Sequence, residues 1–216
     1  TFIYAVKSVT IVEIMGRDAG WLTAASALAR NGYNTAPHLI YLPEVPFDKE
    51  DFLLDVKRML FERNNVIVAV SEGIRDASGK TLEFLVKEKL GVKVRSVEVN
   101  VLQRCAAHLA SKTDLDEAFA LGRKAVALSE EGVTASMVTM RRISDAPYEI
   151  AYEHAEIRHI ANEAKSIPRE WINDAGNDVA QPLIDYLAPL VLGEVPVKYE
   201  NGIPVYMDVS HLAKHQ

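Results

Sequence analysis

An arginine stands at the end of an apolar, β-branched run, where Arg17 follows Gly16. Such a run is typical of a buried strand, and open α/β sheets bind their ligands beyond the carboxyl ends of strands. Glycine lets a ligand approach the backbone, and a guanidinium offers a planar fork of donors to phosphate or hydroxyl oxygens. From this turn alone, a surface arginine that caps the strand or pairs with Asp18 remains an open alternative.

Charged residues follow two further predicted strands. Glu72 comes two residues after the apolar run 65–70, and Arg104 follows the segment 92–101, in which valine alternates with polar residues. A carboxylate can accept hydrogen bonds from sugar hydroxyls, although a glutamate in this place could also simply cap the next turn. Together, Arg17, Glu72 and Arg104 predict a site for an anionic, hydroxyl-rich ligand.

Arg95 lies near the start of the strand that precedes Arg104. Nine residues of strand at about 3.3 Å each separate the two arginines by roughly 30 Å. Both side chains could hardly reach one small ligand within a single subunit. Arg95 therefore either serves the site of a neighbouring subunit or is a solvated charge.

Other reactive side chains give weaker signals. His211 and His215 have a spacing that could bind a metal on a helix, but two histidines at the end of the chain are a weak signal, so we expect no metal site. We expect Cys105 to be a buried structural thiol. Neither a GxxxxGK[ST] nor a GxGxxG nucleotide motif is present.

Composition limits the function classes. The chain has 216 residues and a net charge of −6, which argues against a surface built for nucleic acid or anionic membranes. A single cysteine excludes an intrachain disulfide and fits a reducing compartment. No apolar run approaches the roughly 20 residues that span a bilayer. We expect a soluble, cytoplasmic protein with one α/β domain over residues 1–216.

The elements that must position these residues alternate along the first two-thirds of the chain. Apolar patterning predicts strands at 8–15, 38–42, 65–70, 92–101 and 135–143. Helices are predicted at 18–31, 48–61, 78–90 and 113–130. This order predicts parallel strands with right-handed crossovers. Beyond it, the pattern predicts helices at 155–165 and 178–190 and an extended tail at 196–209 with a turn at Asn201-Gly202.

In its motifs the chain resembles the phosphofructokinase family. The segment 12–17 is similar to the family's fructose-phosphate motif, and 68–73 resembles the strand whose glutamate holds the sugar. The segment 102–104 resembles the one whose arginine holds the 6-phosphate, and Arg95 matches an arginine donated across a subunit interface. The order and spacing of the four motifs make the resemblance specific.

The resemblance implies a three-layer, doubly wound, mostly parallel sheet that lacks the N-terminal half of the family fold. It implies the glycolytic transfer of a phosphoryl group to the 1-hydroxyl of fructose 6-phosphate, with Arg17 as the catalytic residue. The substrate-binding residues that it implies are Met15, Gly16, Arg17, Glu72, Arg95 and Arg104. Mg²⁺ and the phosphoryl donor would bind through the absent half, so the chain is expected to be inactive alone. A homodimer or homotetramer is expected.

Two positions depart from the ATP-dependent bacterial pattern. Val101 stands where those kinases have a histidine, and Ser8 where they have an arginine. The amino-acid sequences of residues 16–24 and 37–44 are more similar to those of the pyrophosphate-dependent branch of the family. This similarity favours pyrophosphate over ATP as the phosphoryl donor. Two alternatives remain open: a non-catalytic, sugar-phosphate-binding regulatory subunit, and an unrelated α/β ligand-binding domain.

Overall fold

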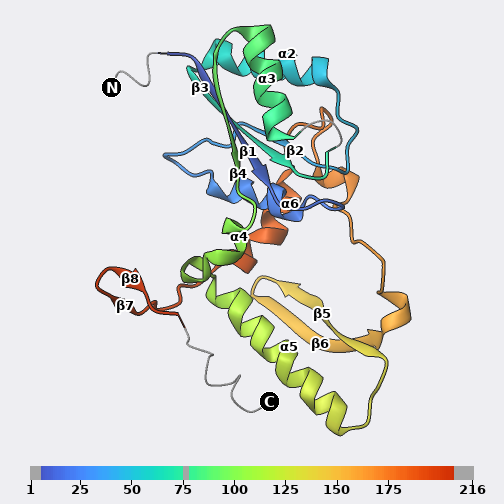
Figure 1. Ribbon diagram of the computed structural model, residues 1–216. Coiled ribbons are helices and arrows are strands. Elements are labelled where there is room, and N and C mark those ends of the chain that lie inside the picture. Colours follow the sequence, from blue (N-terminus) through green and yellow to red (C-terminus); the bar gives the residue numbers. More distant parts are fainter. Residues whose placement is uncertain (1–5, 75–77, 207–216) are drawn as a thin grey trace, which may run out of the picture.

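A parallel sheet with its helices forms one end of the molecule, and a long helix on an antiparallel hairpin forms the other (Figure 1). The computed structural model describes residues 6–74 and 78–206. His211 and His215 lie outside the described residues. In the described part of the chain, no helix is both long and apolar enough to cross a membrane.

The parallel sheet has four strands in the order β2-β3-β1-β4. They are β1 (Ser8–Ile14), β2 (Leu39–Tyr41), β3 (Asn65–Ser71) and β4 (Lys93–Glu98), and all neighbours pair in parallel. In the central pair, Ile14 is opposite Ser71, so β1 and β3 end side by side. Four of the five strands predicted in this part of the chain form this sheet, with β4 shorter than its predicted range.

Helices cover both faces of this sheet. On one face, α2 (Lys49–Glu62) and α3 (Gly79–Leu90) bury Phe52, Val56 and Leu82 against the sheet. On the other, α1 (Trp21–Ala25), the 3-10 helix η2 (Ser26–Ala29) and α6 (Gln181–Leu187) form a second core. Local signals set the helix ends, since the Asp48 and Ser78 side chains accept bonds from first-turn amides. The predicted three-layer α/β fold is confirmed.

The chain leaves β1 and β3 toward opposite faces of the sheet. After β1 it enters α1, whereas after β3 it enters α3 on the other face. Neighbouring strands whose connections part in this way leave a crevice at their carboxyl ends. Arg17 and Glu72 both follow these ends.

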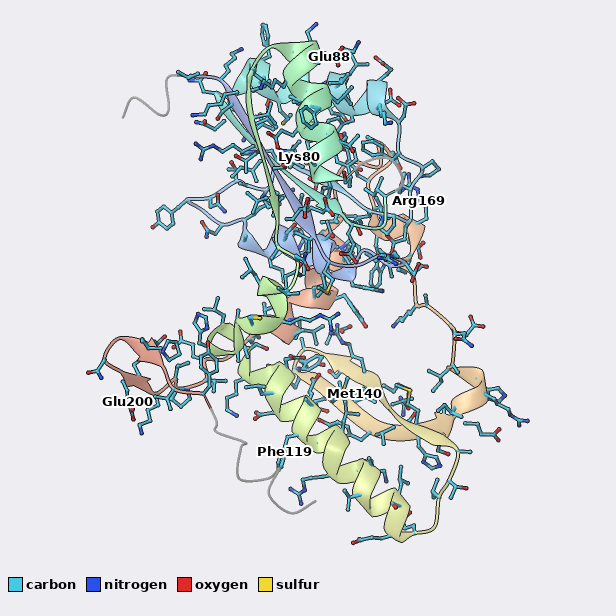
Figure 2. All side chains as sticks on the ribbon, viewed as in Figure 1. Lys80, Glu88, Phe119, Met140, Arg169 and Glu200 are labelled. Carbon is cyan, nitrogen blue, oxygen red and sulfur yellow. The ribbon has the colours of Figure 1, made fainter. Side chains whose placement is uncertain are left out.

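The second part of the molecule begins after β4. The short helices α4 (Leu102–Cys105) and η3 (Ala107–Leu109) lead into α5 (Lys112–Glu130). Helix α5 packs on a hairpin of β5 (Ser136–Asp145) and β6 (Tyr148–Glu156). Phe119 lies on α5 with 69% of its surface exposed (Figure 2).

Two sequence predictions are wrong in this part. The strand predicted at 135–143 does not join the parallel sheet but pairs antiparallel with β6. The helix predicted at 155–165 is absent, and the end of β6 and the 3-10 helix η4 (Ile157–His159) occupy its start. Alanine and glutamate favour helix locally, but the two-residue turn at Ala146-Pro147 reverses the chain onto β5, and pairing outweighs propensity.

The C-terminal elements return to the parallel sheet. The 3-10 helix η5 (Arg169–Trp171) precedes α6, and the 3-10 helix η6 (Ala188–Val191) extends α6. Together, α6 and η6 confirm the helix predicted at 178–190, which begins at Gln181. A small hairpin of β7 (Tyr199–Glu200) and β8 (Ile203–Pro204) turns at Asn201-Gly202, which confirms the predicted turn.

Candidate functional site

The turn after β1 carries Met15, Gly16 and Arg17. Gly16 has φ +137°, and a Cβ at this position would lie 2.8 Å from the Ala19 carbonyl oxygen, so a glycine is required. The hydroxyl of Ser71, at the end of β3, donates to the Gly16 carbonyl oxygen. The helix predicted at 18–31 is regular only from Trp21 to Ala25, because the residues before it form this turn.

The turn after β3 passes directly against Arg17. A Cβ on Gly73 would lie 1.7 Å from the Arg17 carbonyl oxygen, closer than any two such atoms can approach. The Glu72 amide donates to the Ile14 carbonyl oxygen at 3.0 Å. Glu72 and Arg17 therefore lie on adjoining turns, and both side chains are exposed at the same edge of the sheet.

Arg104 reaches the same turn from α4. Its Nε and Nη2 lie 3.3 and 3.2 Å from the Met15 sulfur. The neighbouring Gln103 accepts the Met15 amide through its Oε1 at 2.8 Å. The sequence placed Arg104 at a strand end, but β4 stops at Glu98 and a helical turn presents the guanidinium.

Arg95 lies apart from these residues. On β4 it is opposite Thr10, well before the end of β1. It lines a cavity of about 420 Å³ together with Ser8, Asn65 and Lys93. The Ser8 hydroxyl donates a hydrogen bond to the Asn65 side chain at 2.7 Å. Ser8 therefore lies with Arg95 at the start of the strands and not at the turn that carries Arg17. The residues brought together at the carboxyl edge are Met15, Gly16, Arg17, Glu72 and Arg104.

The chemistry of this edge suits an anionic sugar. Two guanidinium groups can bind phosphate oxygens, and one carboxylate can accept hydroxyl protons. A cavity of about 870 Å³ lies elsewhere and includes Trp21, Leu28, Leu109 and Leu190 in its lining. That lining includes Lys165 but neither Arg17, Glu72 nor Arg104, so we place the candidate site at the turns.

The sequence did not identify the residues that hold the Met15-Gly16 backbone in place. Ser71 and Gln103 lie within the motif segments 68–73 and 102–104, but their hydrogen bonds to this backbone depend on the fold. Glu44, three residues after β2, accepts hydrogen bonds from the amides of Gly20 and Ile167. The only signal in the sequence for such a role is the position of Glu44 just beyond a buried strand.

Metal and thiol chemistry find no support at this site. Among residues 6–74 and 78–206, no group of three or more histidine, cysteine, aspartate or glutamate side chains could hold a metal ion. Cys105 was expected to be buried but is exposed, because α4 lies at the surface between the two parts of the molecule.

The family profile described as Phosphofructokinase matches residues 3–129, more than half of the chain. The chain belongs to the phosphofructokinase family. The matched region contains both adjoining turns and the helix that carries Arg104. This family membership agrees with the resemblance on which the site was predicted.

Several relatives are similar over almost the whole chain. A pyrophosphate–fructose 6-phosphate 1-phosphotransferase of Halomonas elongata is 39% identical over 229 residues, covering 96% of this chain and 54% of its own. A pyrophosphate-dependent phosphofructokinase of Marinobacter aquaeolei superposes with a TM-score of 0.85 at 37% identity, covering 93% of this chain and 52% of its own. The enzyme of the same description from Nitrosospira multiformis gives 0.86 at 37% identity, covering 94% and 52%. The chain spans about half the length of these relatives.

Proposed function

We propose that this chain provides the sugar-phosphate acceptor site of a 6-phosphofructokinase. The reaction transfers a phosphoryl group to the 1-hydroxyl of fructose 6-phosphate and gives fructose 1,6-bisphosphate. The observation that carries the proposal is the convergence of Arg17, Glu72 and Arg104 on the adjoining turns at one sheet edge. Family membership supports this assignment.

Each side chain has a distinct part in the proposed reaction. Arg104 binds the 6-phosphate by charge-assisted hydrogen bonds, and Glu72 accepts hydrogen bonds from the sugar hydroxyls. Arg17 offsets the negative charge that develops on the transferred group, and Met15 and Gly16 line the sugar. Because phosphoryl transfer depends mostly on positioning and charge stabilisation, a rigid turn is the main contribution of this chain.

The phosphoryl donor is proposed to be pyrophosphate. Support comes from relatives at 39% and 38% identity, which are named for the use of pyrophosphate, whereas an ATP-dependent relative of Pectobacterium carotovorum is 27% identical. Mg²⁺ would neutralise phosphate charge when bound, as the resemblance implies. The resemblance implies that its ligands lie outside this chain.

We further propose that residues 1–216 bind fructose 6-phosphate weakly and do not catalyse transfer by themselves. In this proposal the enzyme works in the cytoplasm as a homodimer or homotetramer, with Arg95 reaching a neighbouring subunit's 6-phosphate. The separation of Arg95 from Arg104 supports such sharing. Turnover by this polypeptide alone, in a coupled assay with pyrophosphate or ATP, would contradict it.

Arg104→Ala tests the acceptor site in the full-length protein. Loss of one charge-assisted phosphate contact costs about 1.5–3 kcal/mol, so we expect the KM for fructose 6-phosphate to rise more than about tenfold. Steady-state kinetics with varied fructose 6-phosphate measure the change. Arg123→Ala, an exposed arginine on α5, is the matched control and should leave KM unchanged. An unaltered KM in Arg104→Ala would refute the site.

A further inference from the structure

The Glu44 carboxylate joins two segments that are far apart in the sequence. Its Oε1 accepts the Gly20 amide at 2.9 Å and the Ile167 amide at 3.1 Å. Its Oε2 is shielded from solvent and has no hydrogen-bond partner among the described residues. Holding a carboxylate oxygen away from water is costly, so the two amide bonds must offset that cost.

The first of these segments is the turn that carries Arg17. Gly20 closes this turn as the residue before α1. A Cβ at Gly20 would lie 2.9 Å from the Glu44 Oε2 and 2.8 Å from a Leu42 methyl group, so the close contact needs a glycine. The other end of the turn is held at Gly16 by the Ser71 hydroxyl. The turn is thus fixed at both ends, with Arg17 between them.

The second segment returns from the β5–β6 hairpin to the parallel sheet. It contains Ile167, which is buried among the residues of the α1–α6 core. A parallel link lies beside the Glu44 bridge, since the Trp21 indole nitrogen donates to the Lys165 carbonyl oxygen at 2.6 Å. The Arg17 turn is therefore tied to the segment that leaves the second part of the molecule.

We propose that Glu44 is a positioning residue for Arg17. It fixes the Gly20 end of the turn and ties that end to the segment around Ile167. The inference rests on the proposed function, because it gives Glu44 a part in the phosphoryl-transfer step. Since the Arg17 side chain is exposed, its placement depends on the turn backbone that Glu44 helps to hold.

Glu44→Ala and Glu44→Gln in the full-length protein test this role. Alanine removes the acceptor, and because a displacement of about 1 Å can cost up to about 100-fold, we expect kcat to fall about 10- to 100-fold. The KM for fructose 6-phosphate should change less than about threefold, since Glu72 and Arg104 are held by other bonds. Glutamine keeps a carbonyl oxygen for both amides and should retain most of kcat.

A buried core variant separates positioning from general destabilisation. Val86→Ala opens a cavity in the α3 layer, far from Glu44 along the chain, and lowers stability. All variants are assayed below their melting temperatures, where Val86→Ala should keep its kcat. The inference is overturned if Val86→Ala loses as much kcat as Glu44→Ala. It is also overturned if Glu44→Gln loses as much as Glu44→Ala.

Amide hydrogen exchange over residues 16–20 distinguishes this inference from the proposed function. If the wild-type enzyme does not turn over fructose 6-phosphate, the proposed function is wrong and exchange alone decides the role of Glu44. Faster exchange of the turn in Glu44→Ala, restored in Glu44→Gln, supports positioning. Unchanged exchange in Glu44→Ala overturns it.

Discussion

The carbonyl oxygen of Arg17 occupies the place where a side chain at position 73 would begin. At the residue scale, such contacts determine the geometry of the site. The turns at Arg17 and Gly73 can lie this close only because position 73 has no Cβ. Ser71, the last residue of β3, adds a bond from its hydroxyl to the Gly16 carbonyl oxygen. The positions of Arg17 and Glu72 therefore depend on small neighbours as much as on their own charges.

Gly73→Ala should disrupt the site more than it disrupts the fold. The new methyl group would meet the Arg17 carbonyl oxygen at 1.7 Å, which forces the two turns apart. A displacement of about 1 Å is enough to lower kcat up to about 100-fold, and steady-state kinetics of the full-length protein measure it. Gly32→Ala is the matched control, because a Cβ there meets nothing within 4 Å. Equal activity of the two variants would contradict this account.

At the scale of elements, hydrogen bonds between strand ends complement the apolar core. His38, just before β2, accepts the Ile67 amide of β3 through its Nδ1 at 2.9 Å. Burial, followed by the nearby Arg63 and Arg30, lowers the pKa of His38 below its usual value. A protonated Nδ1 cannot accept the bond, so the native pairing of β2 with β3 favours the neutral imidazole.

The pH dependence of stability should carry the signature of His38. Because its pKa is lower folded than unfolded, the unfolded chain binds more protons between the two values. Stability from this group is present above about pH 6.5 and falls as the pH drops below it. His38→Asn keeps an acceptor oxygen near the Nδ1 position but does not titrate in this range. Urea unfolding at pH 7.5 and 5.5 should show a smaller acid loss for His38→Asn, and equal losses would disprove the role.

At the scale of the whole molecule, Arg142 joins the two parts. From β5, its Nη2 donates to the Tyr186 carbonyl oxygen of α6 at 2.6 Å, and its guanidinium carbon lies 4.2 Å from the Tyr186 ring centre. The ring centre of Tyr148, on β6, lies 4.7 Å from the same guanidinium carbon. The long helix is joined nearby, since the Lys112 amide donates to the Gly193 carbonyl oxygen at 3.0 Å. We propose from these joints that residues 1–216 form one domain.

Arg142→Met should loosen this joint. The substitution removes a charge-assisted bond and two ring contacts from a side chain that is only 17% exposed, so we expect a loss of about 2 kcal/mol in the free energy of unfolding. Arg141→Met is the matched control, because Arg141 is 60% exposed and bonds Glu153 at the surface. Denaturant unfolding should give one cooperative transition in the wild type. Two separate transitions there, or equal effects of both variants, would contradict the joint.

Sequence patterns predicted the parallel sheet and its covering helices well because these elements carry strong local signals. The β-branched run of β3 and the caps at Asp48 and Ser78 place element ends to within a residue or two. Prediction failed at 155–165, where a helix was predicted, because residues 155 and 156 pair with β5 and the chain then forms only the short 3-10 helix η4. It also failed for Cys105, whose exposure depends on how α4 lies between the two parts.

The sequence by itself determined the alternation of strands and helices and the types of the charged residues in the turns, because periodicity and residue type act locally, and the resemblance to the family implied the three-layer class. Only the tertiary structure decided that Gly73 contacts Arg17, that Arg104 reaches Met15 from a helix, and that Arg95 stands apart. It alone showed that Glu44 holds Gly20 and Ile167 together. These contacts join segments up to more than a hundred residues apart, and no local pattern encodes which distant backbone a side chain will meet.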